Sequence, residues 1–132
     1  MLLPDTSVWV AYLRPGSDDI TGALNAALER REVLACGPVV AELAAGARPQ
    51  DRSALVASLS GLPWADLDRH AWLSAGLLAA ELRDRGQVLP LTDLQIAVAA
   101  HANNAALWTA DHHFERLALL LNGLELRLIN SN

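Results

Sequence analysis

The stretch that decides the fold is the first one: Met1-Leu2-Leu3-Pro4-Asp5-Thr6-Ser7-Val8-Trp9-Val10. Apolar residues are followed at once by a carboxylate, two hydroxyls and a second apolar run. This order is typical of a short buried strand that ends at Asp5, with Thr6 or Ser7 capping a helix that begins near Val8. In open α/β sheets, ligands bind at the carboxyl ends of the strands. Asp5 therefore marks a candidate site at that edge.

Short apolar runs alternate with helical patterns along the rest of the chain. Further strands are expected at residues 33–35, 62–65, 105–109 and 126–129. Strands separated by helices predict an α/β fold, here an α/β/α sandwich with a short central parallel sheet. With 132 residues and no linker or repeat, the chain is expected to form a single domain over residues 1–132.

Two of the expected helices carry clear terminal signals. Asp68 is expected to cap a helix over residues 69–85, and Gly86 to end it. The predicted core stripe of this helix consists of Trp72, Leu73, Leu77 and Ala80. Thr92 is expected to cap the next helix, with Asp93 in its first turn.

The bulk composition narrows the function classes. The formal net charge is -5, which argues against coating nucleic acid by charge alone. No apolar run is long enough for a membrane span, and the N-terminus lacks the pattern of a signal peptide. A single cysteine, Cys36, excludes an internal disulfide and is expected to be a small buried residue. We therefore expect a cytoplasmic protein.

Acidic residues recur at positions that a parallel sheet would bring together. Asp5 and Asp111 each follow an apolar run, Asp93 opens a helix, and Glu42 interrupts an apolar helix. Each acid taken alone is better explained by a structural role, as a turn residue, a first-turn acid or an ion-pair partner. Four acids at one edge would repel each other unless a cation neutralised them. Oxygen ligands suit Mg²⁺ or Mn²⁺, which activate water for phosphodiester hydrolysis.

Four motifs in this order resemble the PIN domain, in particular its VapC-type toxin branch, over nearly the whole chain. The motifs are Asp5-Thr6-Ser7, Val39-Val40-Ala41-Glu42-Leu43, Leu91-Thr92-Asp93 and Trp108-Thr109-Ala110-Asp111-His112-His113-Phe114. The resemblance implies an endoribonuclease dependent on Mg²⁺ or Mn²⁺, with tRNA or rRNA as substrate. It also implies a homodimer inhibited by a cognate VapB-type antitoxin.

The resemblance carries specific roles to residues of this chain. The four acids Asp5, Glu42, Asp93 and Asp111 become the catalytic, metal-binding set. Thr109, and Thr6 or Ser7, become candidates to hydrogen-bond those carboxylates or the attacking water, and His112 and His113 are candidate substrate contacts. Many relatives carry a further acid where this chain has His113, and an aliphatic strand residue where it has Pro4. Neither departure affects the four acids.

Two other classes of protein place acids at similar positions. Receiver-type phosphoacceptor domains and aspartyl phosphatases also gather acids at strand ends, but they depend on a lysine beside the phosphoryl group. All ten basic residues here are arginines, which argues against both. The remaining alternative is a catalytically inactive PIN-fold module that binds RNA or protein. The presence of all four acids favours the nuclease.

Overall fold

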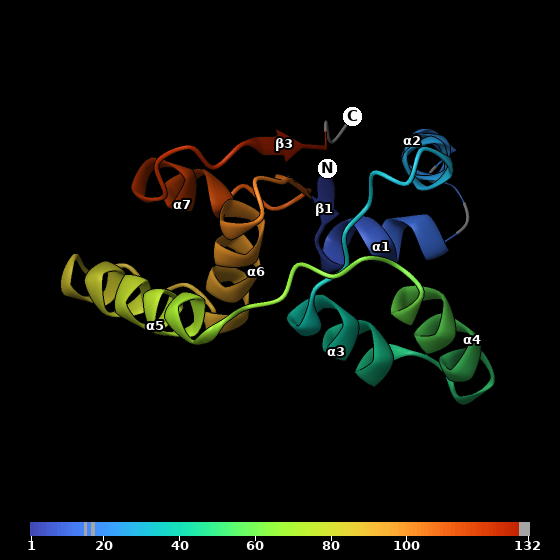
Figure 1. Cartoon of the computed structure of the whole chain (residues 1–132), viewed down its shortest axis with the longest axis horizontal. Helices are drawn as coiled ribbons and strands as arrows, with labels where there is room; N and C mark the ends of the chain where they lie inside the picture. The colour runs from blue at the N-terminus through green and yellow to red at the C-terminus, as the bar shows by residue number, and fades with distance from the viewer. Residues whose placement is uncertain (15, 17, 130–132) are drawn as a thin grey trace.

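The computed structural model describes residues 1–14, 16 and 18–129. The stretch Arg14-Pro15-Gly16-Ser17, whose composition predicts a loop, lies partly outside these residues. Its sheet has three parallel strands in the order β1-β2-β3. They are β1 (Leu2–Pro4), β2 (Ala106–Thr109) and β3 (Leu126–Leu128). The rest of the structure is mainly helical (Figure 1). The predicted α/β class with a short parallel sheet is confirmed.

The sheet is shorter than the sequence predicted. Residues 33–35 and 62–65 form only isolated bridges, Leu2 with Val33 and Ala35 with Trp64. The segment 33–35 turns from one neighbour to the other: Leu34 N–H donates to Leu2 O, and Ala35 N–H donates to Pro63 O. The segment 33–35 is therefore paired with β1, and with residues 62–65, over only one or two residues each. Pro63 has no N–H and cannot donate a further hydrogen bond to extend the second pairing.

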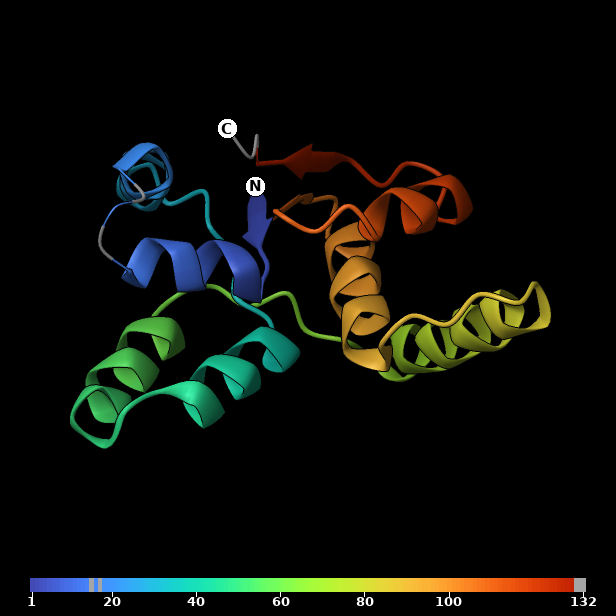
Figure 2. The ribbon, with the colours of Figure 1, turned by 180° about the vertical axis from the view of Figure 1, so that it is seen from behind.

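Seven helices surround the strands in the described part of the chain. They are α1 (Thr6–Leu13), α2 (Asp18–Glu29), α3 (Gly37–Gly46), α4 (Pro49–Ser60), α5 (Arg69–Asp84), α6 (Leu91–Ala102) and α7 (Phe114–Leu120). In both views of the ribbon, α1 to α4 lie on one side of β1 and α5 to α7 lie on the other (Figures 1 and 2). None of the described helices is both long enough and apolar enough to cross a membrane.

Helix α6 lies at the centre of the packing. It contacts α3, α5, α7 and β2, and its buried residues occupy more than one face. They are Leu94, Ile96, Ala97, Val98, Ala99 and Ala100. Alanines let neighbouring backbones approach closely, so α6 is held from several sides. This fixes its first turn, which carries Asp93, relative to α3 and the sheet.

The predicted core stripe of α5 is wrong. Trp72, Leu73 and Leu77 are 50%, 61% and 71% exposed. The buried residues of α5 are instead Ala71, Ala75, Leu78 and Leu82. They follow the spacing of a helix packed closely along one seam, and small residues allow α5 to approach the alanine-rich α6. The predicted stripe contains the largest apolar side chains of α5, whereas the buried stripe includes small side chains that fit against α6.

Two of the predicted helix ends are confirmed and two caps are wrong. Asp68 accepts from Ala71 N–H at 2.8 Å, and Gly86 has the positive φ (75°) that a terminal glycine allows. Helix α6 begins at Leu91 without a side-chain cap, so Thr92 lies inside its first turn. At α1 the N-cap is Asp5 itself, because the strand ends one residue earlier and its carboxylate accepts from the helix backbone.

Candidate active site

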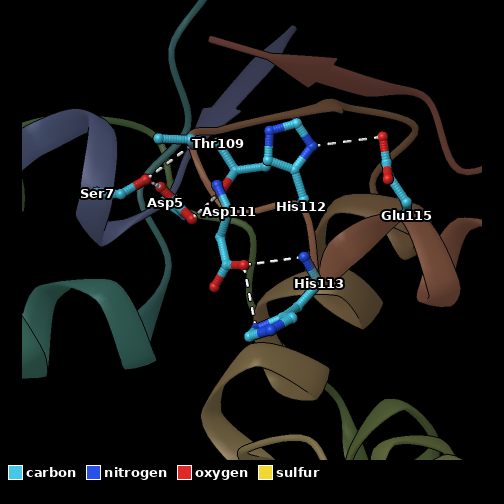
Figure 3. Close-up of polar contacts among 8 residues, drawn as sticks. Asp5, Ser7, Thr109, Asp111, His112, His113 and Glu115 are labelled. Carbon is cyan, nitrogen blue, oxygen red and sulfur yellow. Dashed lines mark hydrogen bonds and ion pairs between the residues drawn. The ribbon is translucent and has the colours of Figure 1, made fainter. Parts of the chain in front are cut away.

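Asp5 is a buried carboxylate at the junction of β1 and α1. Only 5% of the residue is exposed, and Asp5 N–H donates to Trp108 O of β2 at 2.9 Å. Its carboxylate accepts from the hydroxyls of Ser7 and Thr109 and from Val8 N–H, 3.2 Å away (Figure 3). Hydrogen bonds to a charged acceptor are the stronger kind, so these three donors hold the side chain in one orientation.

The same two hydroxyls tie Asp5 to the loop that follows β2. Ser7 Oγ accepts from Ala110 N–H at 3.0 Å, and Thr109 Oγ1 accepts from Asp111 N–H at 2.9 Å. Each hydroxyl thus donates to the carboxylate and accepts from the loop, which uses both of its capacities. Thr109 is fully buried, so water cannot replace these contacts. The start of α1 and the Asp111 loop are therefore fixed to one another.

The hydroxyl of Thr6, the alternative to Ser7, does not hydrogen-bond to Asp5. Its hydroxyl oxygen is buried and has no hydrogen-bond partner within residues 1–14, 16 and 18–129. Cys36 lies near the acids and is buried, as expected. Burial raises the pKa of its thiol to about 11, and the charges of Glu42 and Asp5 add to the rise. The thiol therefore stays protonated and is a poor nucleophile.

Asp111 lies at the turn after β2 and is paired with His113. Its Oδ1 accepts from the His113 backbone N–H at 2.9 Å and lies 3.2 Å from His113 Nδ1. His112 faces away, with Nδ1 3.6 Å from the Glu115 carboxylate (Figure 3). The sequence pattern does not distinguish the two histidines, and it does not reveal the contact between His113 and Asp111. The Asp-x-His spacing in a turn was the available signal, because an aspartate in a turn accepts from the backbone two residues on.

Asp93 lies in the first turn of α6, with a partly buried side chain. Burial raises its pKa from 3.8 to about 6, and the negative charges of Asp111, Glu42 and Asp5 contribute in that order. Because charges more than about 10 Å apart are largely screened, such contributions indicate that the acids share one neighbourhood. His113 acts in the opposite direction and lowers the pKa.

Glu42 is the most open of the four acids. It lies on α3, which contacts α6, and its residue is exposed. Its charge acts on both Asp93 and Cys36. The structure thus brings an acid from α3 towards those at the starts of α1 and α6 and at the turn after β2.

The chemistry of the acid set fits a hard divalent cation, since carboxylate oxygens are its preferred ligands and positive charge would offset their repulsion. The four acidic side chains do not converge on a common point as the ligands of one metal ion would, however. Within the described ranges, no three His, Cys, Asp or Glu residues are close enough to hold a metal ion. The oxygens of Asp5 and Asp111 are instead engaged by the hydroxyls and by His113.

A surface cavity of about 360 Å³ opens between α3, α5 and α6. Its lining includes Ala41, the residue before Glu42, and Gln95, two residues after Asp93. Half-exposed Trp72 forms another part of the wall. The cavity is therefore bounded by the two helices that carry Glu42 and Asp93.

The fold is similar to those of several solved toxin–antitoxin structures. The chain is 26% identical to a chain of VapBC2 from Rickettsia felis bound to a DNA fragment from their promoter, with 98% of both chains covered and a TM-score of 0.78. It is 23% identical to a chain of DNA-bound VapBC from Salmonella typhimurium, covering 96% of this chain and 98% of that one, with a TM-score of 0.70.

A third similar structure is VapBC-5 from Mycobacterium tuberculosis. The identity is 21%, the coverage is 97% of this chain and 98% of that one, and the TM-score is 0.66. At such identities the second and third matches show the fold alone. A comparison with curated proteins finds no significant match.

The family model gives the assignment. The PIN domain model matches residues 2–120, a range that includes all four predicted motifs. The resemblance predicted from those motifs is confirmed. This chain belongs to the PIN domain family.

Proposed function

We propose that this chain is a VapC-type toxin, an endoribonuclease that cleaves RNA with the help of Mg²⁺ or Mn²⁺ bound by Asp5, Glu42, Asp93 and Asp111. Two kinds of observation support the proposal: PIN domains are generally nucleases, and the similar structures come from VapBC complexes. The observation that carries the site assignment is the electrostatic coupling of Asp93 to the other three acids. Such repulsion is relieved by a cation.

The chain's own residues would divide the work. Asp5, oriented by Ser7 and Thr109, would supply a fixed oxygen ligand, whereas Asp93, whose ionised form is disfavoured by burial and by the other acids, would be a ligand that gains most from the charge of the cation. When bound, Mg²⁺ or Mn²⁺ offsets the carboxylate charge, polarises the phosphodiester and activates water. His112 and His113, both exposed, are available to contact the RNA phosphates.

The cavity between α3, α5 and α6 supports a place for the RNA strand on the helices that carry Glu42 and Asp93, although none of the four acids lines it. The exposed face of Trp72 offers a surface on which an unpaired base can stack. Single-stranded segments are the usual targets of sequence-specific RNA recognition. We therefore assign the substrate to an unpaired segment of tRNA or rRNA.

The proposed protein partners are a VapB-type antitoxin and a second copy of the chain, in the cytoplasm. Trp72, Leu73 and Leu77 expose apolar surface on α5, of the kind found at protein interfaces. An antitoxin arginine would offset the repulsion among the acids as a metal ion does. Full inhibition by an antitoxin that has no arginine in its contacting segment would count against that contact.

The direct test is cleavage of total RNA and purified tRNA by the metal-depleted protein, after addition of Mg²⁺, Mn²⁺ or EDTA. Asp5→Asn and Asp93→Asn should each lower the rate by at least about 100-fold, because a ligand of the cation is lost. Asp19→Asn, an exposed acid in the first turn of α2, is the matched control and should cleave normally. RNA binding without cleavage by the wild type would favour the inactive module instead.

A further inference from the structure

The cavity between α3, α5 and α6 is bordered by residues 61–68, the segment that joins α4 to α5. In both views of the ribbon this segment crosses from the side of α3 and α4 to α5 (Figures 1 and 2). The lining includes Pro38 of α3, Ala65, Asp66 and Leu67 of this segment, Trp72 of α5 and Gln95 of α6. The volume of about 360 Å³ falls within the range of roughly 300–1,000 Å³ that small-molecule sites occupy, so the cavity has room for one nucleobase.

Three of these side chains offer contacts of different kinds. The Trp72 indole is half exposed and presents a flat apolar surface. Asp66 is exposed, and Gln95 is partly buried on a helix that packing holds from several sides. Among the residues whose positions the structure describes, no hydrogen bond or ion pair engages the Asp66 carboxylate or the Gln95 amide. Both groups are therefore available to a ligand in the cavity.

The charge of Asp66 decides which part of an RNA this cavity can hold. A carboxylate only accepts hydrogen bonds, and it repels the phosphates of the backbone, whose usual charged partners are arginine and lysine. No arginine is among the described residues that line the cavity. The edge of a base, with its N–H groups, is therefore the part of RNA that fits here, with the ring stacked on Trp72.

The lining also distinguishes among the four bases. Guanine alone presents two adjacent donors on its Watson–Crick edge, N1–H and the N2 amino group, and the two oxygens of a carboxylate can accept from both at once. Guanine O6 lies next to N1–H and is an acceptor, which suits the amide N–H₂ of Gln95. Adenine and cytosine would turn the lone pair of a ring nitrogen towards the carboxylate, and uracil would offer it a single donor.

Resting on the proposed function, we propose that this cavity reads one unpaired guanine of the RNA substrate. Trp72 stacks on the base, Asp66 accepts from N1–H and the N2 amino group, and Gln95 donates to O6. Helices α3 and α6 contribute both to the cavity wall and to the acid set, through Glu42 and Asp93, so the guanine lies at a fixed distance from the bond that is cut. The cavity determines the sequence preference, and the acids carry the cleavage.

The test measures how the RNA pentamers UUGUU, UUAUU, UUCUU and UUUUU bind to the full chain, by fluorescence anisotropy in EDTA so that metal-dependent cleavage does not occur. UUGUU should bind at least about 10-fold more tightly than the other three, because a bidentate contact to a base discriminates to about this degree. With Mg²⁺ or Mn²⁺ added, the ends produced from total RNA should share a guanine at one position relative to the cut.

Variants separate the roles of the three side chains. Asp66→Asn keeps the size of the side chain but replaces an acceptor by a donor, so it should bind all four pentamers about equally. Trp72→Ala should weaken binding of UUGUU by about 10-fold through loss of stacking, and Trp72→Phe should restore much of it. Asp84→Asn, an exposed acid at the other end of α5, is the matched control and should keep the guanine preference. Circular dichroism checks that the variants fold alike.

The inference would be overturned by equal binding of the four pentamers to the wild type, by a preference for another base, or by a guanine preference that survives in Asp66→Asn. Metal-dependent cleavage that continues in those cases leaves the proposed function standing. Guanine-selective binding that depends on Asp66, in a wild type that cleaves no RNA, would support the cavity as a guanine site and overturn the nuclease assignment.

Discussion

The starts of α1 and α6 place an acid in two opposite environments. At α1, Asp5 is buried, caps the helix and accepts from two hydroxyls and a backbone N–H. At α6, Asp93 is partly buried, no hydrogen bond to its carboxylate occurs within the described part of the chain, and its pKa is raised to about 6. One carboxylate is stabilised by donors and the other is destabilised by burial and its neighbours.

The difference separates two tasks that a metal site requires. A ligand that is already oriented costs little to use, and the Asp5 network provides that orientation. A ligand under repulsion gains most when positive charge arrives, and Asp93 provides that gain. Removing a donor to Asp5 and removing the charge of Asp93 should therefore change the free energy of unfolding with opposite signs.

The largest effect is expected for Thr109→Val, which keeps the shape and removes the hydroxyl. Asp5 would lose a buried donor, and Asp111 N–H would lose its acceptor. We expect the free energy of unfolding to fall by about 2–3 kcal/mol, because hydrogen bonds to charged groups are strong and buried partners remain unsatisfied. Urea unfolding at pH 7.5 measures it. Thr109→Ser keeps the hydroxyl, and if it lost as much as the valine variant, the hydroxyl account would fail.

A smaller effect of opposite sign is expected for Asp93→Asn. In EDTA at pH 7.5 the variant should be more stable by about 1 kcal/mol, once screening of this partly exposed carboxylate is allowed for. A saturating concentration of Mg²⁺ should reverse the order, because the wild type gains more from the cation. A destabilised variant in EDTA would show that the charge of Asp93 is favourable and would reverse the comparison.

The pH dependence follows from the same pKa. The pKa of Asp93 is raised from 3.8 to about 6 in the folded protein. Between pH 3.8 and about 6, the folded state therefore holds a proton that the unfolded state has lost. The contribution of Asp93 is therefore fully present below pH 3.8 and is lost as the pH rises through about 6. The advantage of Asp93→Asn in EDTA should disappear near pH 4.

The smallest effect is expected for Thr92→Ala. Thr92 lies inside the first turn of α6 and makes no capping hydrogen bond, so the free energy of unfolding should change by less than about 0.5 kcal/mol. Asp68→Ala is the positive control. It removes an N-cap hydrogen bond, so the free energy of unfolding should fall by about 1 kcal/mol. An equal fall in the free energy of unfolding for Thr92→Ala and Asp68→Ala would show that Thr92 caps α6, as the sequence predicted.

The sequence predicted what depends on local pattern. The strand before Asp5, the helix signals at Asp68 and Gly86, and the short parallel sheet all follow from neighbouring residues and spacing. The Thr109–Asp5 hydrogen bond joins residues 104 positions apart, and only the folded sheet brings them together. The exposed side of α5 was missed for a related reason, because alanine against alanine packs more closely than the larger residues that the pattern favoured.

The central claim is that Asp5, Glu42, Asp93 and Asp111 share one electrostatic site that a cation relieves. The most direct measurement is the pKa of the Asp93 carboxyl group, obtained from the pH dependence of its ¹³C NMR shift. It is measured in the metal-free wild type, in the wild type with saturating Mg²⁺, and in Asp111→Asn. We predict a pKa of about 6 in the wild type and a lower value in each of the other two. A pKa near the ordinary 3.8, unchanged by Mg²⁺ and by the loss of Asp111, would contradict the account.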